Sequence, residues 1–356
     1  MSEKSILQIL RKEEADRIPI WFMRQAGRYL PEYKTIRTQC ENFMDAVLTP
    51  TIAAEITLQP IKRFDLDAAI VFSDILVLPF AMNVPVNFYE GIGPVLEFDL
   101  NESILLTPQD EKFQKIIEKI CVTVRLTCEH LKKYHPNVAM IGFAGAPWTV
   151  ACYMLEKNRK KGGEFESARQ IAYQQPLEFK KLIDDLTTAT IAFLEAQINA
   201  GAEIIKVFDS HAGLLGEFGF DNFVIQPMQK IVAYFKANYP HIPIIGFPRK
   251  AGILYSKFIH ETKVDCVALD HTLPLDWVRD NLQKNCIVQG NLENIYLTLD
   301  SKGSQSAIKT SVETIIMKLY KDSPGGFIFN LGHGCLPSSK IENIELVIKT
   351  IRELQR

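Results

Sequence analysis

The sequence has no long apolar run, no excess of charge of one sign and no paired cysteine motif. No stretch approaches the roughly 20 apolar residues that cross a membrane, and residues 1–5 lack the pattern of a signal peptide. The net charge of −2 argues against nucleic acid or a membrane surface as the main partner. Seven cysteines without a Cys-x-x-Cys pair argue against a disulfide framework. We therefore expect a cytoplasmic protein with no nucleic-acid or membrane partner.

Common catalytic signatures are also missing. The sequence contains no P-loop, kinase or serine-hydrolase motif. The Gly142–Gly145 segment lacks the third glycine of a dinucleotide fingerprint. No low-complexity segment or long Gly/Ser linker divides the chain, so residues 1–356 are interpreted as one domain with a large core.

What the sequence does contain is a regular alternation of short apolar runs and longer helical patterns. Continuous apolar strands separated by helices favour a parallel sheet that is covered on both faces. Eight such units favour a (β/α)8 (TIM-type) barrel, an α/β fold, over an open sheet. The predicted strands are 18–23, 68–73, 138–143, 204–208, 242–247, 265–269, 286–289 and 327–331.

Three local patterns supplement this prediction. Apolar residues recur at three- and four-residue spacing over 113–131, which predicts a helix. Thr49-Pro50 is typical of a helix start, and Ser339 has capping-box spacing to Glu342 ahead of an apolar stripe. Segment 79–107 is rich in Pro and Gly and predicts an excursion or short hairpin after the second strand.

In a TIM-type barrel, catalytic residues follow the strands at their carboxyl ends. Arg24 and Arg28 follow the first predicted strand, and they flank the small segment Gln25-Ala26-Gly27. Guanidinium groups near a core are costly unless an anion meets them, so the pair indicates a carboxylate or phosphate ligand. The structural alternative is an ion-pair network with Glu32 or Glu55.

Polar residues stand at the ends of the other strands too, and each has a structural alternative. Asp74 and Ser210 could cap helices, and Tyr153 could belong to the core. His333 lies between two glycines, which would leave space for a ligand. The remaining strand-end residues of this kind are Thr149, His211, Arg249, Lys250, Asp270, His271, Gln289 and Asn291.

A metal site is not predicted. His333-Gly334-Cys335 and Asp209-Ser210-His211 could each supply two ligands. A catalytic zinc typically needs three protein ligands, and no recognisable spacing provides a third.

These motifs together resemble one known family. Residues 20–33, Ile-Trp-Phe-Met-Arg-Gln-Ala-Gly-Arg-Tyr-Leu-Pro-Glu-Tyr, are similar to the first signature of the uroporphyrinogen decarboxylases. Residues 142–149 with Tyr153-Met154 resemble the second signature. Further family blocks match in the same order at 72–76, 208–213, 288–292 and 331–334, so the resemblance covers nearly the whole chain.

The resemblance implies a (β/α)8-barrel homodimer that works without metal or organic cofactor. Its substrate would be the tetrapyrrole uroporphyrinogen III, whose four acetate side chains lose CO2 to give coproporphyrinogen III in haem biosynthesis. The implied catalytic residues are Asp74, Arg28 and Tyr153. The implied substrate-binding residues are Arg24, Gln25, Ala26, Gly27, Arg28, Arg37, Asp74, Tyr153, Ser210 and His333.

The roles follow from the chemistry of that reaction. Asp74 would lie beneath the macrocycle and stabilise the ring cation formed when a pyrrole carbon is protonated. Arg28 is the proton donor by family analogy, but its high pKa makes this role awkward. The alternative is that Arg28 orients the leaving carboxylate while a substrate group or water supplies the proton.

Two other functions compete with this one, and one segment has two interpretations. A cobamide-dependent methyltransferase would use zinc held by a His-x-Cys pair and a distant Cys, which His333-Gly334-Cys335 half matches, but such enzymes lack the arginine motif. A porphyrin-binding protein without activity is the second rival.

The basic segment 157–161 has two interpretations: it either attracts a polyanionic substrate or is a solvated face.

Overall fold

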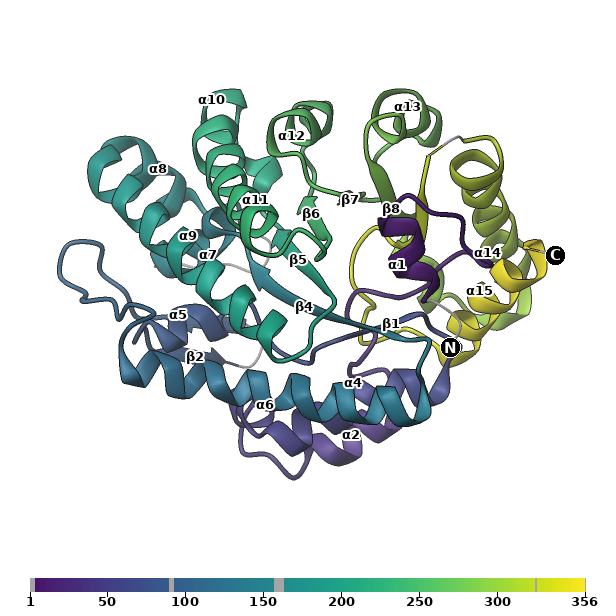
Figure 1. Ribbon diagram of the computed structural model, residues 1–356, viewed down its shortest axis with the longest axis horizontal. Coiled ribbons are helices and arrows are strands. Elements are labelled where there is room, and N and C mark those ends of the chain that lie inside the picture. Colours follow the sequence, from purple (N-terminus) through teal and green to yellow (C-terminus); the bar gives the residue numbers. More distant parts are fainter. Residues whose placement is uncertain (1–3, 90–92, 157–162, 324, 356) are drawn as a thin grey trace.

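The computed structural model describes residues 4–89, 93–156, 163–323 and 325–355. Its centre is a seven-stranded parallel sheet of order β1-β4-β5-β6-β7-β8-β9, curved and surrounded by helices (Figure 1). The predicted TIM-type class is confirmed. Seven of the predicted strands form with small differences at their ends: β1 (Ala68–Ile70), β4 (Ala139–Gly145), β5 (Ile204–Asp209), β6 (Ile244–Pro248), β7 (Cys266–Ala268), β8 (Ile287–Leu292) and β9 (Phe327–Leu331).

The first predicted strand, 18–23, is the exception. It lies between β9 and β1, where the carbonyls of Pro19 and Ile20 accept from the amides of Phe329 and Asp67 at 2.8 Å. Within it the structure assigns only a single bridge, Ile20 to Phe329. Side chains replace the missing ladder, because the amides of Ile20, Phe22 and Met23 donate to Asp67 Oδ2, Gln25 Oε1 and Asn330 Oδ1. The segment therefore completes the barrel without being a regular strand.

Helices pack around the sheet and connect its strands. The apolar pattern over 113–131 is confirmed as part of α6, and Thr49-Pro50 does begin α4. The capping box was wrong: Lys340 is the N-cap of α15, and Ser339 Oγ accepts from the amide of Leu336. The α-helices are α1 (Ser5–Leu10), α2 (Pro31–Arg37), α3 (Phe43–Leu48), α4 (Pro50–Arg63), α5 (Val77–Ala81), α6 (Glu111–Tyr134), α7 (Pro147–Leu155), α8 (Glu166–Gln174), α9 (Pro176–Asn199), α10 (Glu217–Phe220), α11 (Gln226–Asn238), α12 (Leu254–Thr262), α13 (Leu275–Val278), α14 (Ser301–Ile316) and α15 (Ile341–Leu354).

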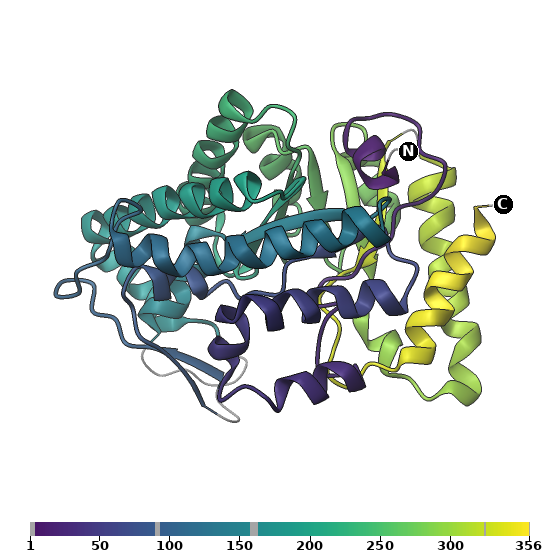
Figure 2. The ribbon, with the colours of Figure 1, turned by 60° about the horizontal axis from the view of Figure 1, so that its bottom comes forward.

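The excursion after β1 contains the predicted hairpin. Strands β2 (Val86–Tyr89) and β3 (Gly93–Leu96) pair antiparallel, outside the main sheet. Figure 2 shows this hairpin at one end of the molecule, away from both termini. The basic segment 157–161 lies outside the described residues.

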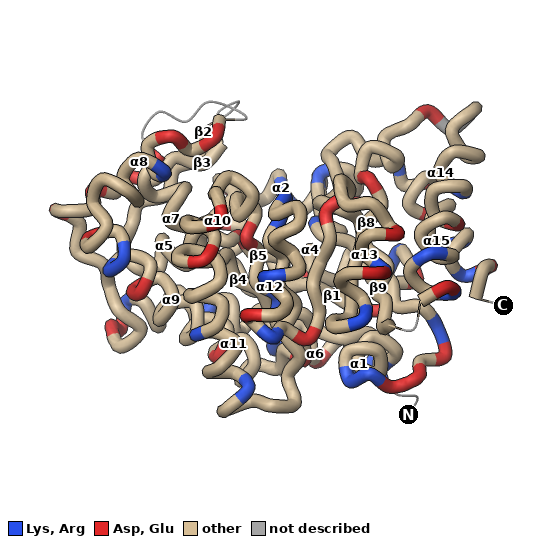
Figure 3. The backbone as a smooth tube through the Cα atoms, turned by 90° about the horizontal axis from the view of Figure 1, so that it is seen from above, with Lys and Arg blue, Asp and Glu red and all other residues tan. Residues whose placement is uncertain are grey.

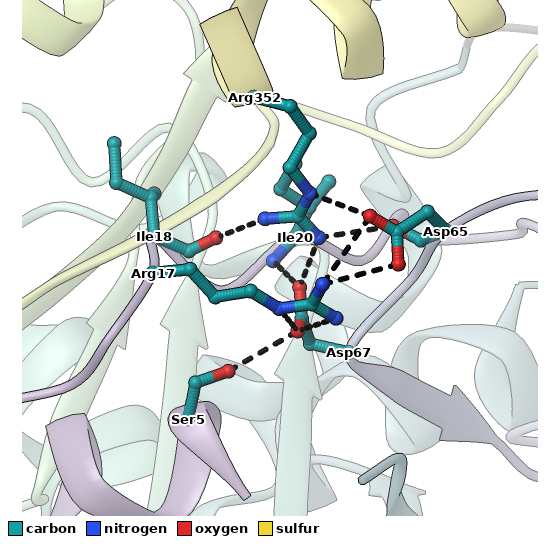
Figure 4. Close-up of polar contacts among 7 residues, drawn as sticks. All are labelled: Ser5, Arg17, Ile18, Ile20, Asp65, Asp67 and Arg352. Carbon is teal, nitrogen blue, oxygen red and sulfur yellow. Dashed lines mark hydrogen bonds and ion pairs between the residues drawn. The ribbon is translucent and has the colours of Figure 1, made fainter. Parts of the chain in front are cut away.

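The amino end of the barrel is closed by α1 and by a buried carboxylate. Apolar residues of α1, such as Ile6 and Leu10, pack against the inward-facing starts of the strands. Asp67, directly before β1, accepts from Ser5 Oγ at 3.1 Å, from Arg17 Nε at 2.7 Å and from Arg352 Nη2 at 2.8 Å (Figure 4). This cluster ties the start of the chain and α15 to β1.

The barrel interior is apolar except for a few polar side chains. Lys206 on β5 is fully buried, with its Nζ 4.7 Å from the ring centroid of Trp21 and 4.9 Å from that of Phe208. Burial lowers the pKa of Lys206 to about 7.

On the outside of the barrel, acidic and basic residues are interspersed along the chain (Figure 3), in keeping with the net charge of −2. None of the helices in the described ranges has the length and apolarity of a membrane span.

Candidate active site

The arginine motif forms a turn between segment 18–23 and α2. Arg24 adopts a left-handed backbone with φ 57°. The Gln25 amide donates to the Phe22 carbonyl, and the buried Gln25 carboxamide accepts from Phe22 N at 3.1 Å and donates to Ala68 O at 3.0 Å. Tyr29 Oη donates to Gln25 O at 2.5 Å. Gln25 thus holds the turn against β1 with both its side chain and its backbone.

The turn leaves Arg24 and Arg28 exposed and without a carboxylate partner. Glu32 pairs with Arg63 at 2.8 Å, and Glu55 pairs with Lys62 at 2.8 Å. Among the residues that the structure describes, neither Arg24 nor Arg28 makes an ion pair. The ion-pair network with Glu32 or Glu55 was therefore wrong, and both guanidinium charges remain available to a ligand.

Arg37, Ala26 and Gly27 lie in the same region. Arg37 ends α2 and donates from Nη1 to Cys40 O at 2.9 Å. Ala26 and Gly27 are half-buried in the turn, where Gly27 O accepts from Leu30 N at 3.0 Å. Arg37 and Arg28 both lower the pKa of Tyr33, although burial outweighs them and raises it, so both charges lie near this ring.

Asp74 is half-buried after β1. Its Oδ1 accepts from Leu76 N at 2.8 Å, and its carbonyl accepts from Val77 N at 3.1 Å at the start of α5. Leu76 is the N-cap of α5 and has no side-chain cap, so Asp74 bonds to the turn ahead of the helix and the capping alternative was wrong. Two residues earlier, the Phe72 ring packs edge-on against Tyr33 with centroids 5.8 Å apart. The segment between β1 and Asp74 therefore contacts α2, the helix that carries Arg37.

Tyr153 and Ser210 stand at the ends of neighbouring units. Tyr153 on α7 is half-buried, and its ring centroid lies 5.4 Å from that of Phe165 and 5.4 Å from that of His211. Ser210 follows β5 between Asp209 and His211. The Tyr153 ring is therefore brought to the loop that carries Ser210.

A buried network fixes the loop of Ser210. Thr149 Oγ1 donates to Asp209 Oδ1 at 2.5 Å and accepts from His211 N at 3.1 Å. Trp148 Nε1 donates to His211 O at 3.0 Å. Burial raises the pKa of Asp209 to about 7. Hydrogen bonds of Asp209 and Thr149 thus hold the loop that carries Ser210 in place.

His333 lies in a basic cluster formed by Arg24, His211, Arg249, His271 and His333. Burial lowers the pKa of His333 to about 3, and the nearby charges of Arg249 and Arg24 add to the effect, followed by His271 and His211. These side chains come from the ends of five different barrel units. A neutral His333 beside fixed positive charges can both donate and accept hydrogen bonds.

The glycines beside His333 serve the chain rather than a ligand. A Cβ at position 332 would lie 2.3 Å from the His271 amide nitrogen, and one at position 334 would lie 2.5 Å from Arg24 Cδ. The predicted ligand space is therefore filled by two neighbouring loops. Close approach of these loops brings Arg24, His271 and His333 together.

The sequence placed Arg249 and His271 at strand ends but did not include them in the site. The signal that could have identified them was their position, since both come directly after predicted strands.

The geometry offers no evident metal site: within the described ranges, no three His, Cys, Asp or Glu side chains are grouped as a ligand set. Cys335 is buried, which raises the pKa of its thiol to about 12.

The model of one protein family, "Uroporphyrinogen decarboxylase (URO-D)", matches residues 1–354. The chain belongs to the uroporphyrinogen decarboxylase family. A curated relative, the uroporphyrinogen decarboxylase of Rhodospirillum rubrum, is 42% identical over 99% of this chain and 97% of its own. That of Paracoccus denitrificans is 41% identical over 99% of this chain and 100% of its own.

Solved structures of low sequence identity share the fold. A methyltransferase from Methanosarcina mazei has a TM-score of 0.77 at 17% identity, covering 99% of this chain and 98% of its own. A B12-independent methionine synthase from Shewanella sp. W3-18-1 has a TM-score of 0.57 at 10% identity, covering 86% and 87%. At such identities the likeness extends to the barrel alone.

Proposed function

We propose that this chain is a uroporphyrinogen decarboxylase that removes the four acetate carboxylates of uroporphyrinogen III as CO2 and yields coproporphyrinogen III, without metal or organic cofactor. The observation that carries the proposal is the pair of exposed guanidiniums, Arg24 and Arg28, which have no carboxylate partner in the described part of the chain. A substrate with eight carboxylates supplies the missing anions. Each charge-assisted hydrogen bond contributes roughly 1.5–3 kcal/mol.

The binding roles follow from the geometry of the turn. Arg24, Arg28, Arg37 and the backbone amides of Ala26 and Gly27 bind acetate and propionate groups. Gln25 contributes differently, because its amide and carboxamide are already bonded within the turn. Ser210 and neutral His333, which lie on other loops, form hydrogen bonds with further carboxylates of the substrate. Tyr153 positions the edge of the tetrapyrrole ring.

Asp74 is the electrostatic residue of the mechanism. Protonation of a pyrrole carbon creates a cationic ring that accepts the electrons released with CO2. A fixed carboxylate beneath that ring stabilises charge that exists only after protonation, so it raises kcat rather than ground-state binding. Arg28 orients the departing carboxylate, because a guanidinium is too weak an acid to release its proton readily. A substrate group or water delivers the proton.

The decisive experiment is anaerobic incubation of the purified protein with uroporphyrinogen III, counting product carboxylates by chromatography with and without a chelator. We expect stepwise loss from eight carboxylates to four, unaffected by the chelator. Binding without multiple turnovers would identify a porphyrin-binding protein. Co-purified stoichiometric zinc and activity lost with the chelator would favour the methyltransferase.

Two substitutions test the roles of individual residues. Asp74→Asn keeps an oxygen for the Leu76 amide, so the fold should persist while kcat falls by about two orders of magnitude. Arg28→Lys should lose about tenfold in kcat/KM, since an ammonium cannot reproduce the planar fork. Arg63→Lys, in an exposed pair with Glu32, is the matched control. Near-wild-type kcat in Asp74→Asn would remove Asp74 from its electrostatic role.

The proposal extends to assembly and location. The chain acts as one catalytic domain over residues 1–356 and forms a homodimer in the cytoplasm. All seven cysteines are free, which supports a reducing compartment. Light scattering after size exclusion and fractionation of the source cells test these two points. A monomer with full activity would refute the dimer as the functional unit.

A further inference from the structure

The loop after β6 holds a guanidinium that the proposed binding set leaves out. Arg249 follows Pro248, the last residue of β6, and its backbone is fixed on both sides. Its amide donates to Asp209 O at 3.0 Å, and its carbonyl accepts from Gly213 N at 3.0 Å. Asp209 and Gly213 enclose the loop of Ser210. Arg249 is therefore bonded through its backbone to a loop that carries a substrate-binding residue.

The contact between these loops is too close for any residue but glycine at position 213. A Cβ there would lie 2.2 Å from Lys250 O. The next amide along, Lys250 N, donates to Asp270 Oδ2 at 2.7 Å. The loops after β5, β6 and β7 are thus joined around Arg249, and its starting position is set before any ligand arrives.

The Arg249 side chain lacks the partners that a structural arginine has. Its Nε is shielded from solvent and has no hydrogen-bond acceptor among the described residues. The carboxylate next to it, Asp270, is occupied by Lys250 N, by Thr272 N at 3.0 Å and by Tyr255 Oη at 3.2 Å. Leaving a buried donor without an acceptor costs free energy, which an incoming acceptor would recover.

The charge of Arg249 is directed at the proposed site. Burial lowers its pKa, Asp270 and Tyr255 oppose this, and the nearby charge of Arg24 lowers it further. Arg249 is also the largest electrostatic contributor to the low pKa of His333, ahead of Arg24. Two guanidiniums and a neutral imidazole thus lie close together, and the carboxylate beside Arg249, Asp270, already accepts from Lys250, Thr272 and Tyr255. Like charges held this close favour binding of an anion.

We propose that Arg249 is a further substrate-binding residue, a guanidinium that holds one carboxylate of the tetrapyrrole on the side of the site formed by the loops after β5, β6 and β7. This rests on the proposed function. We assign to Arg249 a carboxylate that stays bound through the reaction, because its backbone is bonded to the loop of Ser210 and its charge acts on His333. Binding that is equal in the ground state and the transition state lowers KM and leaves kcat unchanged.

The test compares Arg249→Gln, Arg249→Lys and Lys250→Gln with the wild type. In Arg249→Gln we expect KM for uroporphyrinogen III to rise about ten- to a hundredfold with kcat nearly unchanged. Arg249→Lys should recover part of the loss, since it restores the charge but not the fork. Lys250→Gln removes the same charge from the exposed neighbouring residue and should keep the wild-type KM.

A second measurement separates this inference from the proposed function. Equilibrium binding of oxidised uroporphyrin III, which carries the same eight carboxylates, is followed by quenching of tryptophan fluorescence. A weaker Kd in Arg249→Gln than in Lys250→Gln supports the role of Arg249 whether or not turnover occurs. A wild type that releases no CO2 refutes the proposed function alone.

Three results would overturn the inference. They are an unchanged KM and Kd in Arg249→Gln, a fall in kcat at unchanged KM, and an equal loss in Lys250→Gln, which would indicate only general attraction of the polyanion. Circular dichroism and the melting temperature report the fold of each variant. No hydrogen bond of the Arg249 side chain is present in the described structure to be lost, so both should match the wild type.

Discussion

Gln25 is expected to act by positioning the arginine turn rather than by touching the substrate, and replacing it with leucine tests this. Leucine fills a similar volume but offers no hydrogen bonds. The change leaves the Phe22 amide and the Ala68 carbonyl, both bonded to the Gln25 carboxamide, without partners in a buried place. Each unsatisfied buried group costs about 1–3 kcal/mol, so the loss of unfolding free energy for the two groups should be about 2–6 kcal/mol.

This loss converts into a measurable shift of the melting temperature. For a chain of this length the entropy of unfolding is about 0.7 kcal/mol/K, so Gln25→Leu should melt about 3–9 °C below the wild type. Arg24 and Arg28 stand on either side of the loosened turn. A displacement of about 1 Å at such a site costs up to a hundredfold in rate, so kcat/KM should fall far more than the change in stability alone explains.

Gln283 provides the matched control. Its buried Nε2 donates to Leu319 O at 2.6 Å and to Gly325 O at 3.2 Å, before the start of β9 and so at the end of the barrel opposite the site. Gln283→Leu should lose a similar amount of stability and keep kcat/KM. Assays run well below every melting temperature, with thermal unfolding measured in parallel. An unchanged melting temperature in Gln25→Leu, or equal activity losses in both variants, would refute the positioning role.

Three further predictions concern buried ionisable groups. Asp67→Asn removes the buried charge that Arg17 and Arg352 share and should cost about 3–5 kcal/mol. Asp65→Asn, at an exposed carboxylate, should cost under about 1 kcal/mol, and equal melting temperatures of the two variants would contradict this. Burial raises the pKa of Asp209 to about 7, so its contribution to stability is lost as pH rises from about 4 towards 7, at about 1.4 kcal/mol per pH unit. Asp209→Asn should therefore melt progressively higher relative to the wild type between pH 5 and pH 7 (roughly the window of that shift), and a constant difference would refute the shift. Burial, Arg249 and Arg24 lower the pKa of His333 to about 3, so its imidazole should stay neutral near neutral pH. An NMR titration checks this, with the His333 signal assigned by its loss in His333→Gln. A titration midpoint near the ordinary pKa of histidine would contradict the prediction.

The barrel could be predicted because apolar runs and helical periodicity record which residues are buried. Seven of the eight runs became strands for that reason. The run at 18–23 was equally apolar, yet its backbone amides bond to side chains of Asp67, Gln25 and Asn330. Such partners lie far away in sequence or carry no periodic signal, so the pattern predicts burial there and not pairing. Ser339 failed similarly, because its hydroxyl binds the Leu336 amide instead of a helix amide.

The site could be predicted in outline because barrel topology brings the strand ends together. The partners of individual side chains could not. That Glu32 binds Arg63 and leaves the motif arginines without an ion pair depends on how α2 packs against α4. The glycines beside His333 are needed because His271 and Arg24 approach the backbone there too closely for a Cβ. Only the folded arrangement of the loops shows this. Arg249 carried no motif at all, and its importance comes from the cluster around it.

The irregular first strand and the exposed arginines have a common cause. A regular strand over 18–23 would bond its amides to β1 and β9 and continue in the same direction. Here the Gln25 carboxamide occupies the Phe22 amide and the Ala68 carbonyl, so the chain leaves the barrel and turns directly after Met23. The left-handed residue at that turn is Arg24 itself. The backbone irregularity therefore places two guanidiniums at the carboxyl end of the barrel, where a longer strand would have kept them in the wall.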